Sequence, residues 1–468
     1  MSLLDKKTPT VVIGPPGTGK TTFILEKIEE YLANDVGIDE IAFFSFSNKA
    51  VDEAKQRASQ KFKIPLSQLE NFSTLHSFAL RQMGLTREHI LSNNDWRNIS
   101  NELRININVN NDDDIFFNNY DDKYVDLIEK AKRRDIPLRD CWAMFAKDII
   151  WHKLEYIDKG LRDYKDFGYE QFTSGSDGYL VKDQGPKVDF TDLITNFVKG
   201  SFYKHFKVVF FDESQDMSTI QWKMAEKIWK NSEKSYLAMD PNQAIYTWAD
   251  ADVSKAIQIK DEAKNIVVLD QSKRVPRKVW EIVNRVEEQI VGYDDIKWSP
   301  ANRDGSVEFI RGMYHLNMDE GSWLIMGRTR TIRDDMEEVM RKKNIFFRVK
   351  LKDNKYRYSI GSKERNAILT WKDLMRNENN QVPIRLIENL ETRGEDLALE
   401  PRVTLSTIHQ QKGGEADNVI VSLDIGKMAY EEYRTNPISE HRLFYVAFSR
   451  AKENLFIITP QSREAYRI

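Results

Sequence analysis

The sequence has a single cysteine, Cys141, among its 468 residues. One cysteine cannot form an internal disulfide bond or supply a cysteine-based zinc cluster, so both kinds of covalent or metal support are excluded. No apolar stretch reaches the roughly 18 to 20 residues that a membrane-spanning helix requires, and the N-terminus shows no signal peptide. The sequence therefore predicts a soluble, cytoplasmic protein without a membrane partner, with Cys141 in a core beside Trp142.

An excess of one charge sign is also missing. Lys and Arg number 70 against 73 Asp and Glu, which gives a net charge of −3 and no basic tail of the kind that attracts nucleic acid. Any nucleic acid would therefore have to bind in a local groove. The length predicts roughly three compact domains of about 150 residues each. The 24 Phe, 18 Tyr and 10 Trp residues are enough for several cores.

Short apolar runs alternate with helical patterns along the chain. Strands are expected at 8–13, 41–46 and 207–211, and a helix at 21–32. A second such region begins near residue 269, with a helix expected at 331–343 and strands at 323–326, 345–349, 403–408, 419–423 and 455–458. This alternation predicts the α/β class with mostly parallel sheets covered on both faces.

A glycine-rich motif follows the first expected strand. Residues Gly14-Pro15-Pro16-Gly17-Thr18-Gly19-Lys20-Thr21 match G-x-x-x-x-G-K-[ST] between a strand and a helix. Glycines let backbone N–H groups surround phosphates, and the helix N-terminus adds its positive dipole end. Lys20 would neutralise the outer phosphates and the Thr21 hydroxyl would ligate Mg²⁺. The motif predicts a nucleoside triphosphate and Mg²⁺ as cofactors.

Two later strands end in groups that hydrolysis requires. Asp212 and Glu213 follow an apolar run, so Asp212 would hold Mg²⁺ and Glu213 would orient and deprotonate the attacking water. A solvated acidic turn is the alternative. Gln243 follows another expected strand and could contact the γ-phosphate or the water.

Six sequence blocks resemble the UvrD/Rep/PcrA branch of superfamily 1 helicases, in that family's order. They are S-F-S-N-K-A at 45–50, S-T-L-H-S-F at 73–78, D-E-S-Q-D at 212–216, D-P-N-Q-A-I-Y-T-W at 240–248, T-I-H-Q-Q-K-G-G-E at 407–415 and R-L-F-Y-V-A-F-S-R-A at 442–451. The resemblance implies two RecA-like parallel-sheet lobes with ATP between them. The first lobe would comprise 1–85 and 207–268 with a mainly helical accessory insertion at 86–206, and the second 269–351 and 401–468 with a short insertion at 352–400.

The resemblance also implies roles for individual residues. Arg274 and Arg450 would reach the γ-phosphate like arginine fingers, Glu415 would contact the ribose, and Thr22 would lie near the base. Single-stranded DNA would contact Phe46, Asn48, His76, Tyr246, Trp248 and His409, because aromatic platforms stack on any base. A core position for Phe46 and a structural role for His76 stay open. The basic runs at 130–134 and 341–343 could meet phosphates, although solvated helix faces are favoured.

Several positions depart from the family pattern. Lys273 stands where a tyrosine usually stacks on the base, Thr22 where an arginine is common, and no glutamine precedes Gly14. We therefore expect weak discrimination between bases. Ala249 replaces a common arginine, and 352–400 is shorter than the family's second accessory domain, which leaves the strength of strand separation open.

The expected function is that of an ATP-dependent DNA helicase or translocase. It would move 3′ to 5′ on single-stranded DNA, unwind duplex at junctions and act in replication, repair or recombination, as a monomer that could meet a single-strand-binding protein. The alternatives are a translocase that displaces proteins with weak unwinding, and a nucleotide-dependent DNA-binding accessory subunit. RNA is not excluded as a substrate. Binding should be of moderate affinity and sensitive to salt.

Overall fold

The structure, a computed structural model, describes residues 8–107, 121–146, 148–167, 186–201, 204–290, 296–351, 355–359, 392 and 399–468. Contacts between Cα atoms divide the chain into two compact units. The first comprises Met1–Val12, Thr21–Met239 and Tyr246–Val267, and the second Ile13–Lys20, Asp240–Ile245 and Val268–Ile468. Parts of the insertion expected at 86–206, and most of the insertion expected at 352–400, lie outside the described residues.

The first unit is built on a six-stranded sheet with the order β3-β2-β4-β5-β1-β6. Its strands are β1 (Thr10–Ile13), β2 (Ile41–Ser45), β3 (Phe72–Ser73), β4 (Phe206–Asp212), β5 (Ser232–Met239) and β6 (Asn265–Val268). The pairs β2/β3, β2/β4 and β4/β5 are parallel. All five residues of β2 are buried, and six of the seven in β4, as expected for strands covered on both faces.

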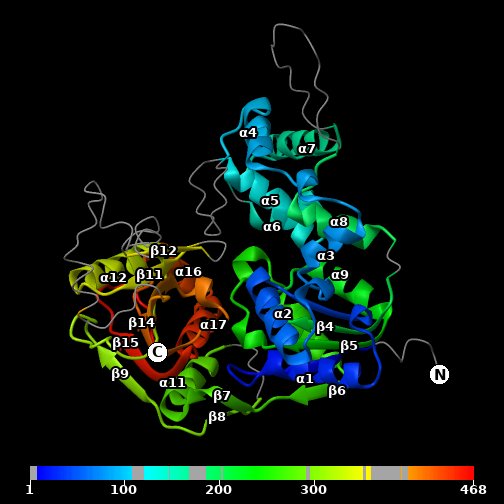
Figure 1. Ribbon diagram of the computed structural model, residues 1–468. Coiled ribbons are helices and arrows are strands. Elements are labelled where there is room, and N and C mark those ends of the chain that lie inside the picture. Colours follow the sequence, from blue (N-terminus) through cyan, green and yellow to red (C-terminus); the bar gives the residue numbers. More distant parts are fainter. Residues whose placement is uncertain are drawn as a thin grey trace, which may run out of the picture. The chain divides into compact units, whose positions relative to one another are not determined.

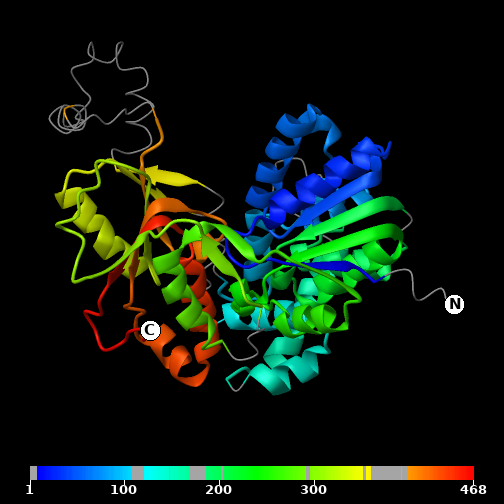
Figure 2. The same ribbon diagram turned by 90° about the horizontal axis from the view of Figure 1, so that it is seen from below.

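Helices flank this sheet. They are α1 (Lys20–Ala33), α2 (Asn48–Phe62), α3 (Leu75–Gln82), α9 (Thr219–Lys230) and α10 (Val253–Glu262). Figures 1 and 2 show the blue helices α1 and α2 beside the green strands that come much later in the chain. Helix α2 begins after Ser47, whose side chain accepts a hydrogen bond from the Ala50 N–H.

The polar segment between β3 and β4 is helical in its described parts, as the sequence predicted. Its helices are α4 (Asn93–Glu102), α5 (Asp122–Arg133), α6 (Leu138–Phe145), α7 (Trp151–Phe167) and α8 (Phe190–Lys199). Helices α4 to α7 share a core of their own, which contains Cys141 with no exposed surface and Trp142 packed against it. The position predicted for Cys141 is confirmed.

The second unit contains a seven-stranded sheet with the order β12-β11-β13-β10-β14-β15-β9. Its strands are β9 (Ser306–Ile310), β10 (Trp323–Gly327), β11 (Phe347–Lys350), β12 (Tyr356–Tyr358), β13 (Val403–Thr407), β14 (Ala416–Ser422) and β15 (Ala451–Ile458). Neighbouring strands of this sheet are parallel, except that β11 and β12 are antiparallel. The short strands β7 (Gln271–Pro276) and β8 (Ser299–Ala301) pair separately.

The helices of the second unit are α11 (Arg277–Glu287), α12 (Arg330–Lys342), α16 (Lys427–Thr435) and α17 (Pro437–Phe448). Helix α12 contacts β10 and β13, and α11 contacts α17. The strand expected at 345–349 begins two residues later. The Ile345 N–H still bonds the Met340 carbonyl, and Asn344 has a positive φ of 51°, so the helix-terminating turn extends through Ile345. Apart from such end effects, the predicted α/β class with parallel sheets is confirmed.

Candidate nucleotide and nucleic-acid sites

The phosphate loop lies between β1 and α1, as its motif requires. The Lys20 ammonium donates to the Gly14 carbonyl at 2.7 Å, and the Thr18 hydroxyl donates to the Pro15 carbonyl at 2.8 Å. Gly17 has a φ of +74°, and a Cβ there would lie 2.4 Å from the Arg274 Cβ. Glycine is required at this position, since any side chain would meet both backbone strain and a clash.

A hydroxyl and a carboxylate meet at the start of α1. The Thr21 hydroxyl donates to Asp212 Oδ2 at 2.8 Å, across 191 residues of sequence, and Asp212 is only 3% exposed. Both are hard oxygen ligands of the kind Mg²⁺ prefers, and a protein usually offers Mg²⁺ one or two such groups beside phosphates and waters. The pair fits the metal that the sequence predicted. No cluster of three or more His, Cys, Asp or Glu able to hold a metal occurs among the described residues.

Glu213 follows Asp212 in an unusual backbone conformation. Its φ of 54° is in the left-handed region, and its N–H donates to Asp212 Oδ1 at 3.0 Å. The Gln215 amide donates to Glu213 Oε2 at 2.5 Å. A non-glycine residue in this region costs of the order of 1 kcal/mol or more and is held there by its surroundings. In this conformation the Glu213 side chain leaves the backbone in a different direction from that of a residue in a regular strand.

A second polar network lies within the second unit. Arg450, 2% exposed, donates through its guanidinium to Gln243 Oε1 at 3.0 Å and to the Val446 carbonyl at 2.9 Å. Lys412 donates to the Gln243 backbone carbonyl at 2.7 Å, and the Gln243 amide donates to Asp240 at 2.7 Å. The structure thus brings together Gln243 and Arg450, two residues that the sequence assigned to the γ-phosphate.

Arg274 and Glu415 form an ion pair in the same unit. The Arg274 Nε lies 2.6 Å from Glu415 Oε2, and Lys452 lies 2.8 Å from the other oxygen. Partial burial would raise the pKa of Glu415, but the two cations outweigh it and hold the pKa at about 2. Glu415 is therefore a carboxylate at neutral pH, able to accept hydrogen bonds from hydroxyl groups.

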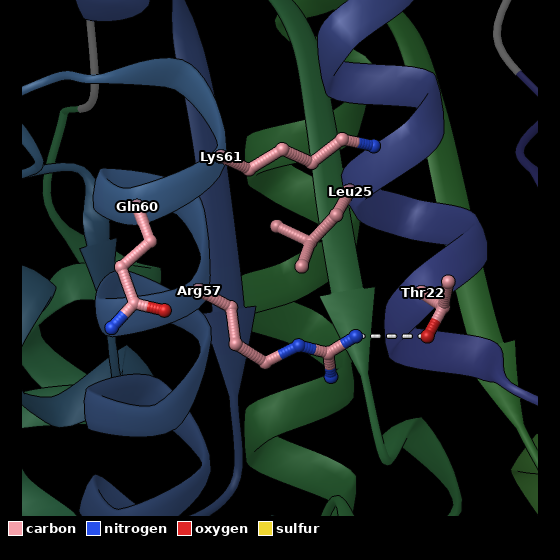
Figure 3. Close-up of a pocket in the computed structure, with 5 residues that line it drawn as sticks. All are labelled: Thr22, Leu25, Arg57, Gln60 and Lys61. Atoms are coloured by element: carbon pink, nitrogen blue, oxygen red, sulfur yellow. Dashed lines mark hydrogen bonds between the residues drawn. The ribbon is translucent and has the colours of Figure 1, made fainter.

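Thr22 lines a pocket that the sequence did not predict (Figure 3). The pocket encloses about 370 Å³ between α1 and α2 and is lined by Thr22, Leu25, Arg57, Gln60 and Lys61. The Arg57 guanidinium reaches from α2 and donates to the Thr22 hydroxyl at 2.8 Å. An arginine is therefore present beside position 22, although it comes from another helix. Nothing local in the sequence connects these two residues.

The predicted DNA-stacking aromatics form a cluster at the surface of the first unit. The Phe46 and Tyr246 rings stack at a centroid distance of 5.1 Å, and Tyr246 meets Trp248 edge-on at 6.1 Å. Phe46 and Tyr246 are partly exposed, and Trp248 is 43% exposed. Phe46 is thus not a core residue. Asn48, the first residue of α2, is also exposed.

The two histidines differ from these aromatics. His76 on α3 meets the exposed Phe190 ring edge-on at 5.9 Å, and burial lowers the pKa of His76 to about 4. His409, in the second unit, has a pKa lowered to about 3 by burial and by the nearby Arg328. Both rings are neutral at physiological pH, so they would contact nucleic acid as hydrogen-bonding groups and not as cations.

The basic run at 130–134 has a role that the sequence analysis missed. Asp250, whose side chain has no exposed surface, accepts from Arg134 at 2.7 Å and Arg133 at 2.9 Å, and Lys130 lies at 3.5 Å. The favoured interpretation, a solvated helix face, was wrong for these three residues. In the other run, Lys342 pairs with the exposed Glu338 along α12, as expected for a solvated helix face, whereas Arg341 pairs with the buried Glu337.

A phosphate loop after one strand of a parallel sheet, with an acidic pair after another strand of the same sheet, is the arrangement of P-loop nucleoside triphosphatases. Comparison with known families is more specific. Residues 2–264 match the UvrD/REP helicase N-terminal domain, and residues 402–458 match the UvrD-like helicase C-terminal domain. Since the first match spans more than half of the chain, the chain belongs to the UvrD/REP helicase family. The class of enzyme is therefore the helicase, as the motifs predicted.

Individual relatives are distant. A probable DNA helicase of Mycoplasma pneumoniae is 24% identical over 487 residues, covering 96% of this chain and 80% of the relative. The ATP-dependent DNA helicase Rep of Buchnera aphidicola is 25% identical, covering 56% and 40% respectively. The ATP-dependent DNA helicase PcrA of Bacillus subtilis is 21% identical, covering 82% and 54%. The chain thus spans most of the first relative but about half or less of the other two.

Among the described residues, no helix combines the length and the apolar character needed to cross a bilayer.

Proposed function

We propose that this protein is an ATP-dependent DNA helicase that moves 3′ to 5′ along single-stranded DNA and unwinds duplex at junctions, acting in replication, repair or recombination. The observation that carries the proposal is the 2.8 Å contact between the Thr21 hydroxyl and Asp212, directly beside the strained Glu213. These are the groups that hydrolysis of a nucleoside triphosphate requires. The direction of movement rests on the resemblance to the family.

The residues divide the chemistry between them. The backbone of Gly14–Gly19 and the Lys20 ammonium would bind the phosphates, with Pro15, Pro16 and Thr18 shaping the loop. Thr21 and Asp212 would hold Mg²⁺, which supplies charge neutralisation at the phosphates. Glu213 would accept the proton of the attacking water. Asp212 hydrogen-bonds the Glu213 N–H, so the metal ligand also fixes the backbone of the base.

Arg274 and Arg450 would stabilise charge on the γ-phosphate, and Glu415 would accept from the ribose hydroxyls. Glu415 already pairs with Arg274. A bound nucleotide would therefore exchange partners with this ion pair, whereas Arg450 is buried and held by Gln243 and Val446. We infer that Arg450 is preorganised and that Arg274 adjusts on binding.

The aromatic cluster of Phe46, Tyr246 and Trp248 would grip single-stranded DNA. Stacking contributes about 1 to 3 kcal/mol per base and does not depend on base identity. This mode of binding needs few excess cations, which suits a chain with a net charge of −3.

We further propose that base discrimination is weak and that Arg57 supplies what remains of it. Its guanidinium already donates to Thr22 in the first turn of α1, and both residues line the same pocket. The test is kcat/KM for ATP, GTP, CTP and UTP with wild type and Arg57→Ala. A strong preference of wild type for ATP, unchanged by the substitution, would contradict this part of the proposal.

The central experiment measures strand displacement on 3′-tailed, 5′-tailed and blunt duplexes, together with hydrolysis stimulated by single-stranded DNA or RNA. Wild type should unwind only 3′-tailed DNA, and Glu213→Gln should bind nucleotide but lose hydrolysis by about a thousandfold. Unwinding from 5′ tails alone would refute the polarity. Stimulated hydrolysis without unwinding would favour the protein-displacing translocase, and DNA binding without hydrolysis the accessory subunit. Mass measurement in solution tests the expected monomer.

A further inference from the structure

A buried carboxylate ends helix α11. Glu287 is 2% exposed and accepts hydrogen bonds from three side chains of the second unit. Its Oε1 accepts from the Asn242 amide at 3.0 Å and from the Tyr445 hydroxyl at 2.9 Å, and its Oε2 accepts from the Trp298 indole N–H at 2.9 Å. The three donors come from three separate segments of the chain, so the Glu287 side chain joins four segments.

Two of these segments carry residues of the proposed active site. Asn242 immediately precedes Gln243 in a single 3₁₀ turn, Pro241–Gln243. Tyr445 lies on α17, and Arg450 follows the end of that helix. Gln243 and Arg450 are themselves joined by the 3.0 Å hydrogen bond. Glu287 therefore connects the same two segments a second time, through residues that would not touch the nucleotide.

An acid is a costly choice for this position. Burial raises the pKa of Glu287 to about 7, and the nearby Asp240 adds to the effect, although the three donors oppose it. A leucine would fill a similar volume without the desolvation cost. A buried, fully hydrogen-bonded carboxylate instead fixes the direction of each donor, because every lone pair it uses has a defined geometry.

We propose that Glu287 is a positioning residue for nucleotide hydrolysis. By accepting hydrogen bonds from Asn242 and Tyr445, it holds Gln243 and Arg450 in a fixed position relative to each other. The inference rests on the proposed function of this site. Glu287 acts through its neighbours, so its loss should lower kcat while leaving nucleotide affinity nearly unchanged.

The orientation of the two oxygens allows a sharp test. In Glu287→Gln, one oxygen can still accept from Asn242 and Tyr445, but the new NH₂ group then faces the Trp298 N–H, and two donors oppose each other. Trp298→Phe removes that N–H. The double variant E287Q/W298F therefore retains the two hydrogen bonds that matter for positioning, without the conflict.

DNA-stimulated kcat and KM for ATP are measured for wild type, E287L, E287Q, W298F and E287Q/W298F. We expect kcat to fall about tenfold or more in E287L, less in E287Q, and to return to within about threefold of W298F in the double variant. KM should stay within about threefold throughout, and binding of a fluorescent nucleotide reports on folding.

The outcomes separate the two proposals. A wild-type protein without nucleotide hydrolysis would overturn the proposed function itself. An active wild type whose kcat is unaffected in E287L overturns only the role of Glu287. If E287L does not fold, E287Q is compared with E287Q/W298F. The role of Glu287 is also overturned if kcat falls equally in these two variants, or if the lower activity comes from a higher KM.

Discussion

The contact between Asp250 and helix α5 gives the prediction that the structure supports in most detail. Asp250 lies two residues after Trp248, and its fully buried carboxylate accepts from Arg133 and Arg134 of the helical segment. The perturbation is Asp250→Asn, which keeps the shape of the side chain and tolerates the positive φ of 65° at this position. It removes the charge and turns one of the two accepting oxygens into an NH₂ donor, which then faces an arginine N–H.

The expected loss of stability depends on how deeply Asp250 and its cationic partners are buried. At about 4 Å in a medium with an effective dielectric constant near 20, two unit charges attract by about 4 kcal/mol. Removing one partner of a buried pair typically costs about 3 to 5 kcal/mol. Here the three cations are 21%, 24% and 37% exposed and regain water, so the loss should be smaller. We expect about 2 kcal/mol, after allowance for this rehydration and for the hydrogen bond that the remaining Asn oxygen still accepts.

Thermal unfolding by calorimetry and DNA-stimulated hydrolysis are the assays. Asp250→Asn should lower the unfolding temperature of the first unit and weaken stimulation by single-stranded DNA, because the turn that carries Tyr246 and Trp248 loses its anchor on α5. Lys130→Gln is the matched control, since its 3.5 Å contact is the longest of the three, and it should cost less than about 0.5 kcal/mol. An Asn variant as stable as wild type would refute the view that this cluster is a structural anchor.

Three further predictions follow from single residues. Gly17→Ala should abolish nucleotide binding in a titration with fluorescent ATP, because of the positive φ and the 2.4 Å clash with Arg274, and wild-type affinity would contradict this. Trp248→Ala should keep basal hydrolysis and lose DNA stimulation; unchanged stimulation would show that this ring is not a platform. Since the folded pKa of His76, about 4, lies below its ordinary 6.5, the folded state binds fewer protons. Stability of the first unit should therefore be full above pH 6.5 and fall by about 3 kcal/mol towards pH 4. His76→Phe should flatten that urea-unfolding profile, and an unchanged slope would contradict the assignment.

The order of strands and helices could be predicted from local patterns because burial dictates them locally. The run Val208–Phe211 is apolar on both faces, so it can only be a covered strand, and the glycines around Lys20 can only be a loop that a helix follows. The element ends were less certain. Strand β11 begins two residues later than predicted, because the turn that ends α12 at Asn344 includes two residues whose types favour a strand.

The candidate site residues were also proposed from the sequence, through motif spacing. Asp212 ends β4, which lies in one sheet with β1, the strand that precedes the phosphate loop, and its contact with Thr21 agrees with the shared Mg²⁺ that the sequence predicted for both residues. No comparable signal marks Arg57, Asp250 or Glu287. Each has an ordinary sequence context. The role proposed for each depends on a hydrogen bond to a residue more than 30 positions away in the sequence.

The sequence by itself thus predicted the chemistry proposed for this protein: a phosphate loop, a hydroxyl and a carboxylate suited to Mg²⁺, a candidate base, and aromatic side chains suited to unpaired bases. Those groups are specified by residue type and short spacing, which a chain carries before it folds. Only the tertiary structure decided which charged side chains form ion pairs inside the protein. Lys130, Arg133 and Arg134 were expected on a solvated helix face, but a single buried carboxylate, that of Asp250, pairs with all three. Electrostatic partners are chosen by distance and burial, and neither is encoded locally.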